Sequence, residues 1–316
     1  MEPTPDRAPL DPLLQAWLER CHATRVSDDT YELRVTTHRT VFTTSSDQRL
    51  LTFLIETEEN LFGDTLGTLL AAERWEVGRL CLHEGHTAWN VTWLEPGRID
   101  ARILGDVITE LRSSDRRLYD VRGRRVPDEA LAAPRWRTRD GFRERWLSEA
   151  ERWLTDRLGK VWRSPEDGSL ACILGREGLQ AICLSLASGG RWAVADAALE
   201  LPGRDQIRQL RKFGVWWACR RPIGKLALRR DARLFVFSHA WPIGRSFSEE
   251  RTFWNLGAAC CEAIVFARAW RDVRQHEEEN PVPRFEEAVL AHQRRMEEAA
   301  FEETMNRLYG PPPEWD

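Results

Sequence analysis

Hydrophobic residues in the N-terminal part of the chain recur first with helical spacing and then in strand-like runs. In LDPLLQAWLERC (10–21), apolar residues stand at positions 13, 14, 17 and 18, the spacing of one helical face. Segments rich in β-branched and aromatic residues follow, separated by short polar turns, and predict strands. The predicted order is α-β-β-β-α-β-β-α. After the first helix, its elements are YELRVTT (31–37), RTVFTTS (39–45), QRLLTFLIET (48–57), the helix LFGDTLGTLLAAERWEV (61–77), RLCLH (79–83), HTAWNVTWL (86–94) and the helix IDARILGDVITELRSSDRRLYD (99–120).

A second series of elements follows residues 121–140, which lose this periodicity and carry two prolines, as a linker does. A local match indicates a repeat, because GRLCL (78–82) and GKLAL (224–228) both open the strand directly after the second helix of their series. The second series comprises the helix 141–159, strands at 160–164, 169–175, 179–187 and 191–201, the helix 204–220, strands at 225–229 and 233–241, and the helix 247–270.

The two series predict an α+β fold of two tandem α-β-β-β-α-β-β-α units, each an antiparallel sheet packed against helices, plus a C-terminal helix. We place a first domain at residues 1–120, a linker at 121–140, a second domain at 141–273 and a helical tail at 274–316.

The tail contains a highly charged segment at 285–310 whose apolar residues form a thin helical stripe. This stripe is too narrow to hold a core by itself, so the segment either docks on the body of the protein or engages a partner. The stripe consists of Phe285, Val289, Met296 and Ala300.

The final PPPEWD is a short binding motif around Trp315 or a disordered terminus.

Composition narrows the class of protein. Of the 316 residues 42% are hydrophobic, with 15 Trp and 12 Phe, which indicates a packed globular chain rather than a disordered one. The net charge of -4 is small for this length, so no overall field attracts nucleic acid or an anionic membrane. The N-terminus lacks the basic and apolar regions of a signal peptide, and no apolar run approaches the roughly 20 residues that span a bilayer. Seven cysteines without a CxxC pair fit reduced thiols, and we expect a cytoplasmic protein.

The densest group of reactive side chains is RLCLHEGHTAWN (79–90), in which Cys81, His83 and His86 fall within six residues. Two residues separate the predicted strands, and a two-residue turn pairs His83 with His86 and Cys81 with Ala88. Alternation then divides the hairpin into two faces. The core face comprises Leu80, Leu82, Trp89, Val91 and Trp93, and the solvated or partner-facing side comprises Arg79, Cys81, His83, His86, Asn90 and Thr92.

This register brings one thiol and two imidazoles close enough for a three-ligand zinc site, which would suit a metal hydrolase. Neither CxH nor HxxH is a specific metal spacing, however, and the second series has no matching ligands. No GxSxG elbow and no GxxxxGK[ST] phosphate loop occurs in the chain. We therefore expect no catalytic residues, no metal and no cofactor, and treat the hydrolase only as an alternative.

A second alternative is nucleic-acid binding through PRWRTRDGFRERW (134–146), which interleaves arginines with aromatic residues. Such a surface can stack bases and pair phosphates. The competing interpretation is a helix whose Phe142 and Trp146 face inward while Arg143 and Arg145 cover its wet side. The missing excess of positive charge favours this structural interpretation.

The element order, with LLAAERW (69–75) before the hairpin and AWNVTWL (88–94) within it, resembles the YbjN family and the class I chaperones of type III secretion. The resemblance covers residues 12–120 and, more loosely, 141–271, where the second copy has Phe237-Ser238 in the region of the Trp-Asn pair. It implies a non-enzymatic protein, since the secretion chaperones dimerise and bind extended segments of partner proteins on apolar patches. Two fused copies resemble a pseudo-dimer within one chain.

The leading hypothesis is therefore a cytoplasmic chaperone-like or adaptor protein that binds a segment of a partner protein. The alternative is a nucleic-acid-binding regulator that uses Arg and Trp surfaces. No membrane partner is expected, and the sequence does not specify the oligomeric state. The predicted partner-binding residues are His83, His86, Asn90, Phe285, Val289, Met296 and Trp315.

Overall fold

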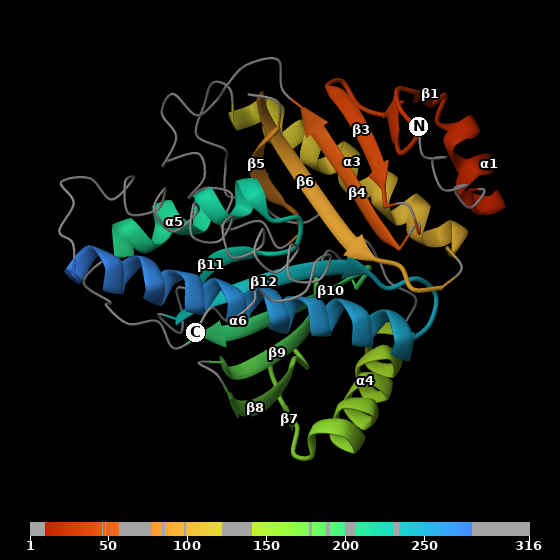
Figure 1. Cartoon of the computed structure of the whole chain (residues 1–316). Coiled ribbons are helices and arrows are strands. Elements are labelled where there is room, and N and C mark those ends of the chain that lie inside the picture. The colour runs from red at the N-terminus through yellow and green to blue at the C-terminus, as the bar shows by residue number, and fades with distance from the viewer. Residues whose placement is uncertain are drawn as a thin grey trace, which may run out of the picture.

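The structure is a computed structural model, and it describes residues 10–45, 47, 49–56, 77–83, 86–97, 99–121, 141–176, 179–187, 190–199, 207–229 and 234–279. Residues 61–76 of the predicted helix at 61–77, most of the predicted linker and the predicted tail helix lie outside these residues. Within them, the chain forms the α+β fold predicted from the sequence, with two six-stranded antiparallel sheets and helices packed against each (Figure 1).

The first sheet has the strand order β1-β2-β3-β4-β6-β5. Asp11 starts the first helix, because its carboxylate accepts from the backbone N–H groups of Leu13 and Leu14. The short strand β1 was not predicted, since Thr24 and Arg25 give no apolar position to detect, whereas the equally short β7 lies within the predicted strand at 160–164. The elements of this first repeat are α1 (Pro12–Arg20), β1 (Thr24–Arg25), β2 (Thr30–Leu33), β3 (Arg39–Thr44), β4 (Leu50–Glu56), β5 (Arg79–His83), β6 (His86–Leu94) and α3 (Ala101–Val121).

The second sheet repeats this topology with the order β7-β8-β9-β10-β12-β11. Its last helix continues to Glu279 instead of ending at Trp270, where the apolar pattern of the sequence stops. The elements of this second repeat are α4 (Phe142–Leu158), β7 (Trp162–Arg163), β8 (Leu170–Arg176), β9 (Leu179–Ala187), β10 (Trp192–Leu199), α5 (Ile207–Arg220), β11 (Lys225–Arg229), β12 (Leu234–Pro242) and α6 (Glu249–Glu279).

Most buried apolar residues of the two repeats form one continuous cluster. Trp93 of β6 stacks on Phe53 and meets Trp192 of β10 edge to face, with ring centroids 6.4 Å apart. Helix α6 lies along β9, β10 and β12 of its own sheet and also contacts β6 of the other. The two repeats thus share a core instead of being separated by solvent.

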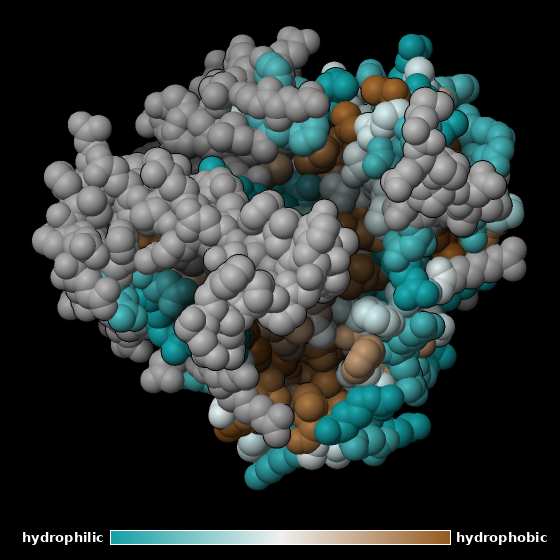
Figure 2. All heavy atoms as spheres, in the orientation of Figure 1, coloured by the Kyte–Doolittle hydropathy of each residue, from teal (hydrophilic) through white to brown (hydrophobic). Residues whose placement is uncertain are grey.

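On the face of the molecule in Figure 2, hydrophobic side chains gather over β9 and beside α4.

None of the helices within the described ranges is both long enough and apolar enough to cross a membrane.

Candidate functional site

The β5–β6 hairpin has the register predicted from the sequence, with Leu80 opposite Trp89, Cys81 opposite Ala88 and His83 opposite His86. The predicted core face is also confirmed, because Leu80 and Trp89 are buried in the main cluster. The opposite face was expected to meet solvent or a partner, but Arg79, Cys81, Asn90 and Thr92 on it are buried, His83 is half-buried, and His86 is the one of its six residues that is exposed. Cys81 is 5% exposed and packs with Ala88, Val41 and Leu54 in a second, small apolar cluster.

The two histidines of the hairpin lie at the end of the first sheet. His86 is exposed, and the Nδ1 of half-buried His83 lies 2.6 Å from Oε1 of the buried Glu56, whose Oε2 lies 2.7 Å from Arg39. Nowhere in the part of the chain that the structure describes do three His, Cys, Asp or Glu side chains form a group that could hold a metal ion.

Each repeat places the start of its last helix against a turn of the other repeat. A Cβ added to Gly97, after β6, would come 3.8 Å from Glu250 of α6. A Cβ added to Gly244, after β12, would come 3.3 Å from Asp100 and 3.5 Å from Ile103, at the start of α3. Reciprocal contacts of this kind are typical of two-fold-related units. The repeats are therefore arranged like the halves of a dimer.

Two buried or part-buried ion pairs hold the repeats together. Arg251 of α6 donates to both carboxylate oxygens of Glu95, at 2.8 to 3.1 Å, and Arg191 lies 2.6 Å from Asp106 of α3. Burial raises the pKa of Glu95 above its ordinary value, although the hydrogen bonds and charge of Arg251 act in the opposite direction. The geometry fixes α6 against the end of β6.

A polar network around Asn255 of α6 completes this contact. Its side-chain N–H groups donate to the carbonyls of Leu94 and Arg251, while its Oδ1 accepts from Leu94 N–H and lies 3.1 Å from Nε2 of His239. Because the Asn255 oxygen is an acceptor, the proton of the neutral His239 ring is on Nε2. Burial lowers the pKa of His239 to about 4, so the ring is neutral at pH 7.

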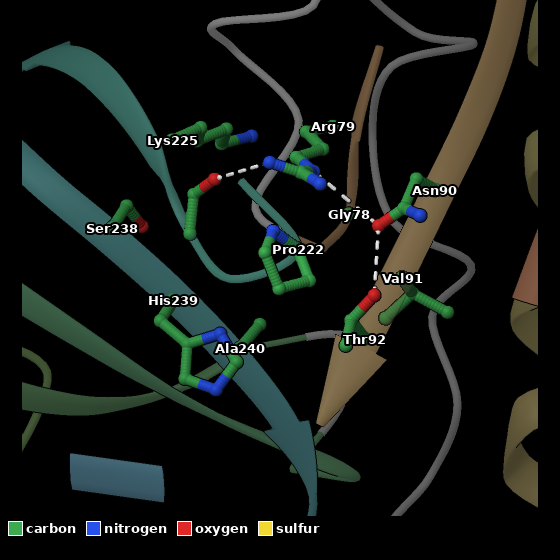
Figure 3. A pocket seen from close by; sticks show the side chains of 11 residues that line it. Gly78, Arg79, Asn90, Val91, Thr92, Pro222, Lys225, Ser238, His239 and Ala240 are labelled. Carbon is green, nitrogen blue, oxygen red and sulfur yellow. Dashed lines mark hydrogen bonds between the residues drawn. The ribbon is translucent and has the colours of Figure 1, made fainter. Parts of the chain in front are cut away.

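Beside this network, the two hairpins enclose a space that we call the junction hollow (Figure 3). Its cavity volume, taken as the space open to the centre of a water-sized sphere, is about 20 Å³. In the strand register, Arg79 of β5 lies opposite Asn90 of β6, and Lys225 of β11 lies opposite Ser238 of β12. Corresponding positions of the two repeats therefore face the same space. The lining residues are Gly78, Arg79, Asn90, Val91 and Thr92 of the first repeat and Pro222, Gly224, Lys225, Ser238, His239 and Ala240 of the second.

Arg79 connects the two sides of the junction hollow. Its Nε donates to Oδ1 of Asn90 at 3.3 Å, and its Nη1 donates to the carbonyl of Gly224 at 3.2 Å (Figure 3). Thr92 also donates to Oδ1 of Asn90, at 3.0 Å. Arg79 and Lys225 are 6% and 7% exposed, so both cations are held where water screens them little.

A second candidate site is on the second sheet, on the face opposite α4 and α6. Along β8, Leu170 and Cys172 are buried against the helices, while Ala171 and Ile173 point to the other face. We call this exposed region the open sheet patch. Its residues lie opposite one another on neighbouring strands β7, β8 and β9. They are Trp162, Ala171, Ile173, Ala181 and Cys183.

The open sheet patch is apolar and accessible. Trp162 is 42% exposed and Ile173 is 69% exposed, and Ala171 lies between them. On the same face of β10, Trp192 and Val194 are buried, and Trp192 meets Trp93 of the first repeat. Asp196, opposite Cys183 on this face, is half-buried.

The Arg- and Trp-rich segment matches the structural interpretation where it is described. Trp146 is 2% exposed and Phe142 packs against the core, while Arg143 and Arg145 are exposed. Arg143 donates to the carbonyl of Asp167 at 2.6 Å. These described aromatic rings are thus not displayed for base stacking.

The predicted partner-binding residues do not form one site. Asn90 is buried in the junction hollow, His83 and His86 lie at the far end of the hairpin, and Phe285, Val289, Met296 and Trp315 are outside the described residues. Sequence analysis missed Arg79 and Lys225 as a pair. The repeated Gly-Arg and Gly-Lys at the start of GRLCL and GKLAL contained the signal, because corresponding residues of two-fold-related units face one another where they lie near the axis.

The chain was also compared with known proteins. No protein-family model, no curated protein and no solved structure matches it.

Proposed function

We propose that this chain is a non-enzymatic binding protein that holds an extended apolar segment of another protein, in the manner of a chaperone or adaptor. The observation that carries the proposal is the open sheet patch, where Trp162 and Ile173 are exposed on one face of neighbouring strands. Exposed apolar groups that lie together on a soluble chain mark an interaction surface.

The chemistry of the patch suits an extended peptide. A strand-like segment presents every second side chain to one face, which matches the spacing of Ala171 and Ile173 along β8. Trp162 offers a large rigid ring of the type that anchors protein interfaces. β7 pairs with β8 only at Leu170 and Ala171, so a segment lying along the patch can also run beside the outer edge of β8 from Cys172 onward.

Two further features support the proposal. The resemblance to the YbjN family and to the secretion chaperones implies binding of extended protein segments on apolar patches. The described cysteines are not joined in disulfides, which agrees with a protein that functions in the reducing cytoplasm. His86 is exposed at the end of the first sheet and stays a candidate for an additional contact.

The proposal is tested by co-purification of partners from the native host with a matched pair of variants. Ile173→Lys places a charge in the open sheet patch, whereas Val26→Lys places the same charge at a 55% exposed position next to β1 of the first sheet. Both side chains are exposed, so we expect each variant to keep its stability within about 0.5 kcal/mol. We expect proteins enriched by the wild type to be reduced about tenfold with Ile173→Lys and unchanged with Val26→Lys. Equal enrichment by both variants would refute the proposal.

A further inference from the structure

Helix α6, which lies along the second sheet in Figure 1, carries apolar residues on two sides. One side packs into the core, and the other is turned away from the sheet. A surface helix normally places charged or polar residues opposite its apolar face, but the outward side of α6 has no charged residue between positions 253 and 264. We call this part of α6 the outward stripe, and it consists of Phe253, Trp254, Gly257, Ala258, Cys261 and Ile264.

The outward stripe is accessible and has room for a second helix. Phe253 is 56% exposed and Trp254 is 43% exposed, and their rings meet edge to face with centroids 6.0 Å apart. A Cβ added to Gly257 would meet no atom of the described residues within 4 Å. Cys261 is also exposed, and Ile264 is half-buried. Small residues beside exposed aromatic rings allow another helix to approach closely, so the stripe has the form of a helix-docking surface.

The chain itself supplies a segment that can reach this stripe. Helix α6 ends at Glu279, and residues 280–284 include Pro281 and Pro283, which favour a turn. The charged segment at 285–310, which the sequence predicts to be a helix, begins directly after this turn. Loops of about two to five residues commonly join two antiparallel helices. A helix that begins at Phe285 can therefore run back along α6.

The lengths of the two helices determine which positions meet. In an antiparallel pair, each step from the loop on one helix is matched by one step on the other, at about 1.5 Å per residue. With residues 280–284 as the loop, positions 300–311 lie beside positions 253–264. In this part of the tail, Phe301, Met305 and Leu308 recur at the spacing of one helical face. The apolar face of the tail is thus level with the apolar part of α6.

We propose that the outward stripe of α6 is the docking surface of the chain's own tail, with Phe301, Met305 and Leu308 packed on it in an antiparallel helix pair. Because the tail is tethered at Glu279, its effective concentration at the stripe exceeds that of a free partner. The open sheet patch lies on the opposite face of the second sheet from α6, so this proposal does not depend on the proposed function.

The test crosslinks Cys261 to a cysteine introduced into the tail of the full chain. In the antiparallel pair, Thr304 is level with Cys261 on a helix whose axis is about 8 to 10 Å away, whereas Ala288 lies about 22 Å further along that axis. We expect a short bis-maleimide to join Cys261 to position 304 in Thr304→Cys and not to position 288 in Ala288→Cys. Peptide mass spectrometry identifies the products. No product at position 304, or an equal yield at both positions, would overturn the proposal.

A mixture of isotope-labelled and unlabelled chains of Thr304→Cys shows which molecule supplies the tail. If the crosslinked peptides always come from chains with the same label, the tail docks on its own α6, as proposed. If they combine the two labels as often as chance allows, the stripe is occupied by the tail of a second copy and the proposal is wrong.

Alkylation of Cys261 gives a second measurement with a matched pair of variants. Met305→Lys places a charge on the docking side of the tail, and Met296→Lys places the same charge on the opposite side of the predicted helix. We expect the alkylation rate of Cys261 to rise about tenfold with Met305→Lys, because the thiol loses its cover, and to stay unchanged with Met296→Lys. The same rate in Met305→Lys and in the wild type would contradict the proposed docking.

Discussion

At the scale of single residues, two glycines show how closely the repeats correspond. Gly78 has a φ of +73° and Gly224 a φ of +71°, a left-handed conformation that glycine adopts without strain. A Cβ on Gly78 would overlap the ring of Trp89, and a Cβ on Gly224 would overlap the ring of Phe237. The same backbone position therefore accommodates a large aromatic ring in each repeat, and this explains why a glycine opens both GRLCL and GKLAL.

Alanine substitution tests this explanation. We expect Gly224→Ala to lower the free energy of unfolding by about 2 kcal/mol or more, because the methyl group meets Phe237 and the backbone is strained. Gly105→Ala in α3 is the control, since nothing lies within 4 Å of its added Cβ, and we expect a gain of about 0.5 to 1 kcal/mol there. Urea unfolding measures both values. A loss of stability at both positions would show that the packing explanation is wrong.

A second prediction at this scale concerns His239 and the dependence of the free energy of unfolding on pH. Its pKa is lowered to about 4 in the folded chain, so between pH 6.5 and about 4 the unfolded chain binds more protons than the folded one. As the pH falls through that window, His239 therefore lowers the free energy of unfolding by about 3 kcal/mol. Below the window it causes no further loss.

The measurement is urea unfolding between pH 7 and pH 4 in the wild type and in two variants. His239→Gln keeps an N–H donor for Asn255 but cannot titrate, and we expect it to flatten the decline. His86→Gln removes an exposed histidine, and we expect it to leave the decline unchanged. A wild-type slope retained in His239→Gln would contradict the assignment of this residue as buried and neutral.

At the scale of elements, α6 is one of the helices that join the repeats, and it does so through the buried pair of Arg251 and Glu95. We expect Arg251→Met to lower the free energy of unfolding by about 3 to 5 kcal/mol at pH 7, because the Glu95 carboxylate is left buried without a counter-charge. The double variant Glu95→Gln with Arg251→Met should recover most of this loss. The loss in the single variant should also shrink at acidic pH, where Glu95 takes up a proton.

Urea unfolding of the single and double variants measures the coupling between the two residues. A double variant as unstable as Arg251→Met alone would mean that packing of the arginine stem, rather than its charge, stabilises the contact.

Local patterns predicted most elements of this fold. The register of β5 and β6 follows from the two residues that separate them, and the ends of β9 and β11 agree with the alternation and turn residues around them. The pattern failed where an element is too short, as in β1, or where a helix continues after its apolar stripe, as in α6 beyond Trp270. The burial of Cys81 was missed because the alternation of one hairpin says nothing about what Val41 and Leu54 contribute from neighbouring strands.

At the scale of the whole molecule, the junction hollow and the shared core depend on contacts between residues far apart in the sequence. Arg79 and the carbonyl of Gly224 are brought together only when the repeats dock, and no periodicity within one repeat predicts that docking. The open sheet patch has the same origin, since the first repeat meets β10 at Trp192 and leaves Ile173 of β8 exposed. The sequence thus predicted the repeats but not the surfaces that their association creates.

The shared core predicts that the two repeats unfold together. Since Trp93 and Trp192 belong to one continuous cluster, loss of either repeat exposes the buried face of the other. We expect hydrogen exchange in increasing urea to show peptides from both sheets losing protection at the same midpoint. Two well-separated midpoints would show that the repeats are independent domains.

The central claim, that the open sheet patch holds a segment of another protein, is tested most directly by site-specific photo-crosslinking in the native host. A photoreactive amino acid at position 173 lies in the patch, and the same group at position 26, which is also exposed, provides a control. We predict that position 173 crosslinks to a defined peptide segment of one or a few proteins and that position 26 does not. Absence of crosslinks at position 173, or the same products from both positions, would contradict the claim.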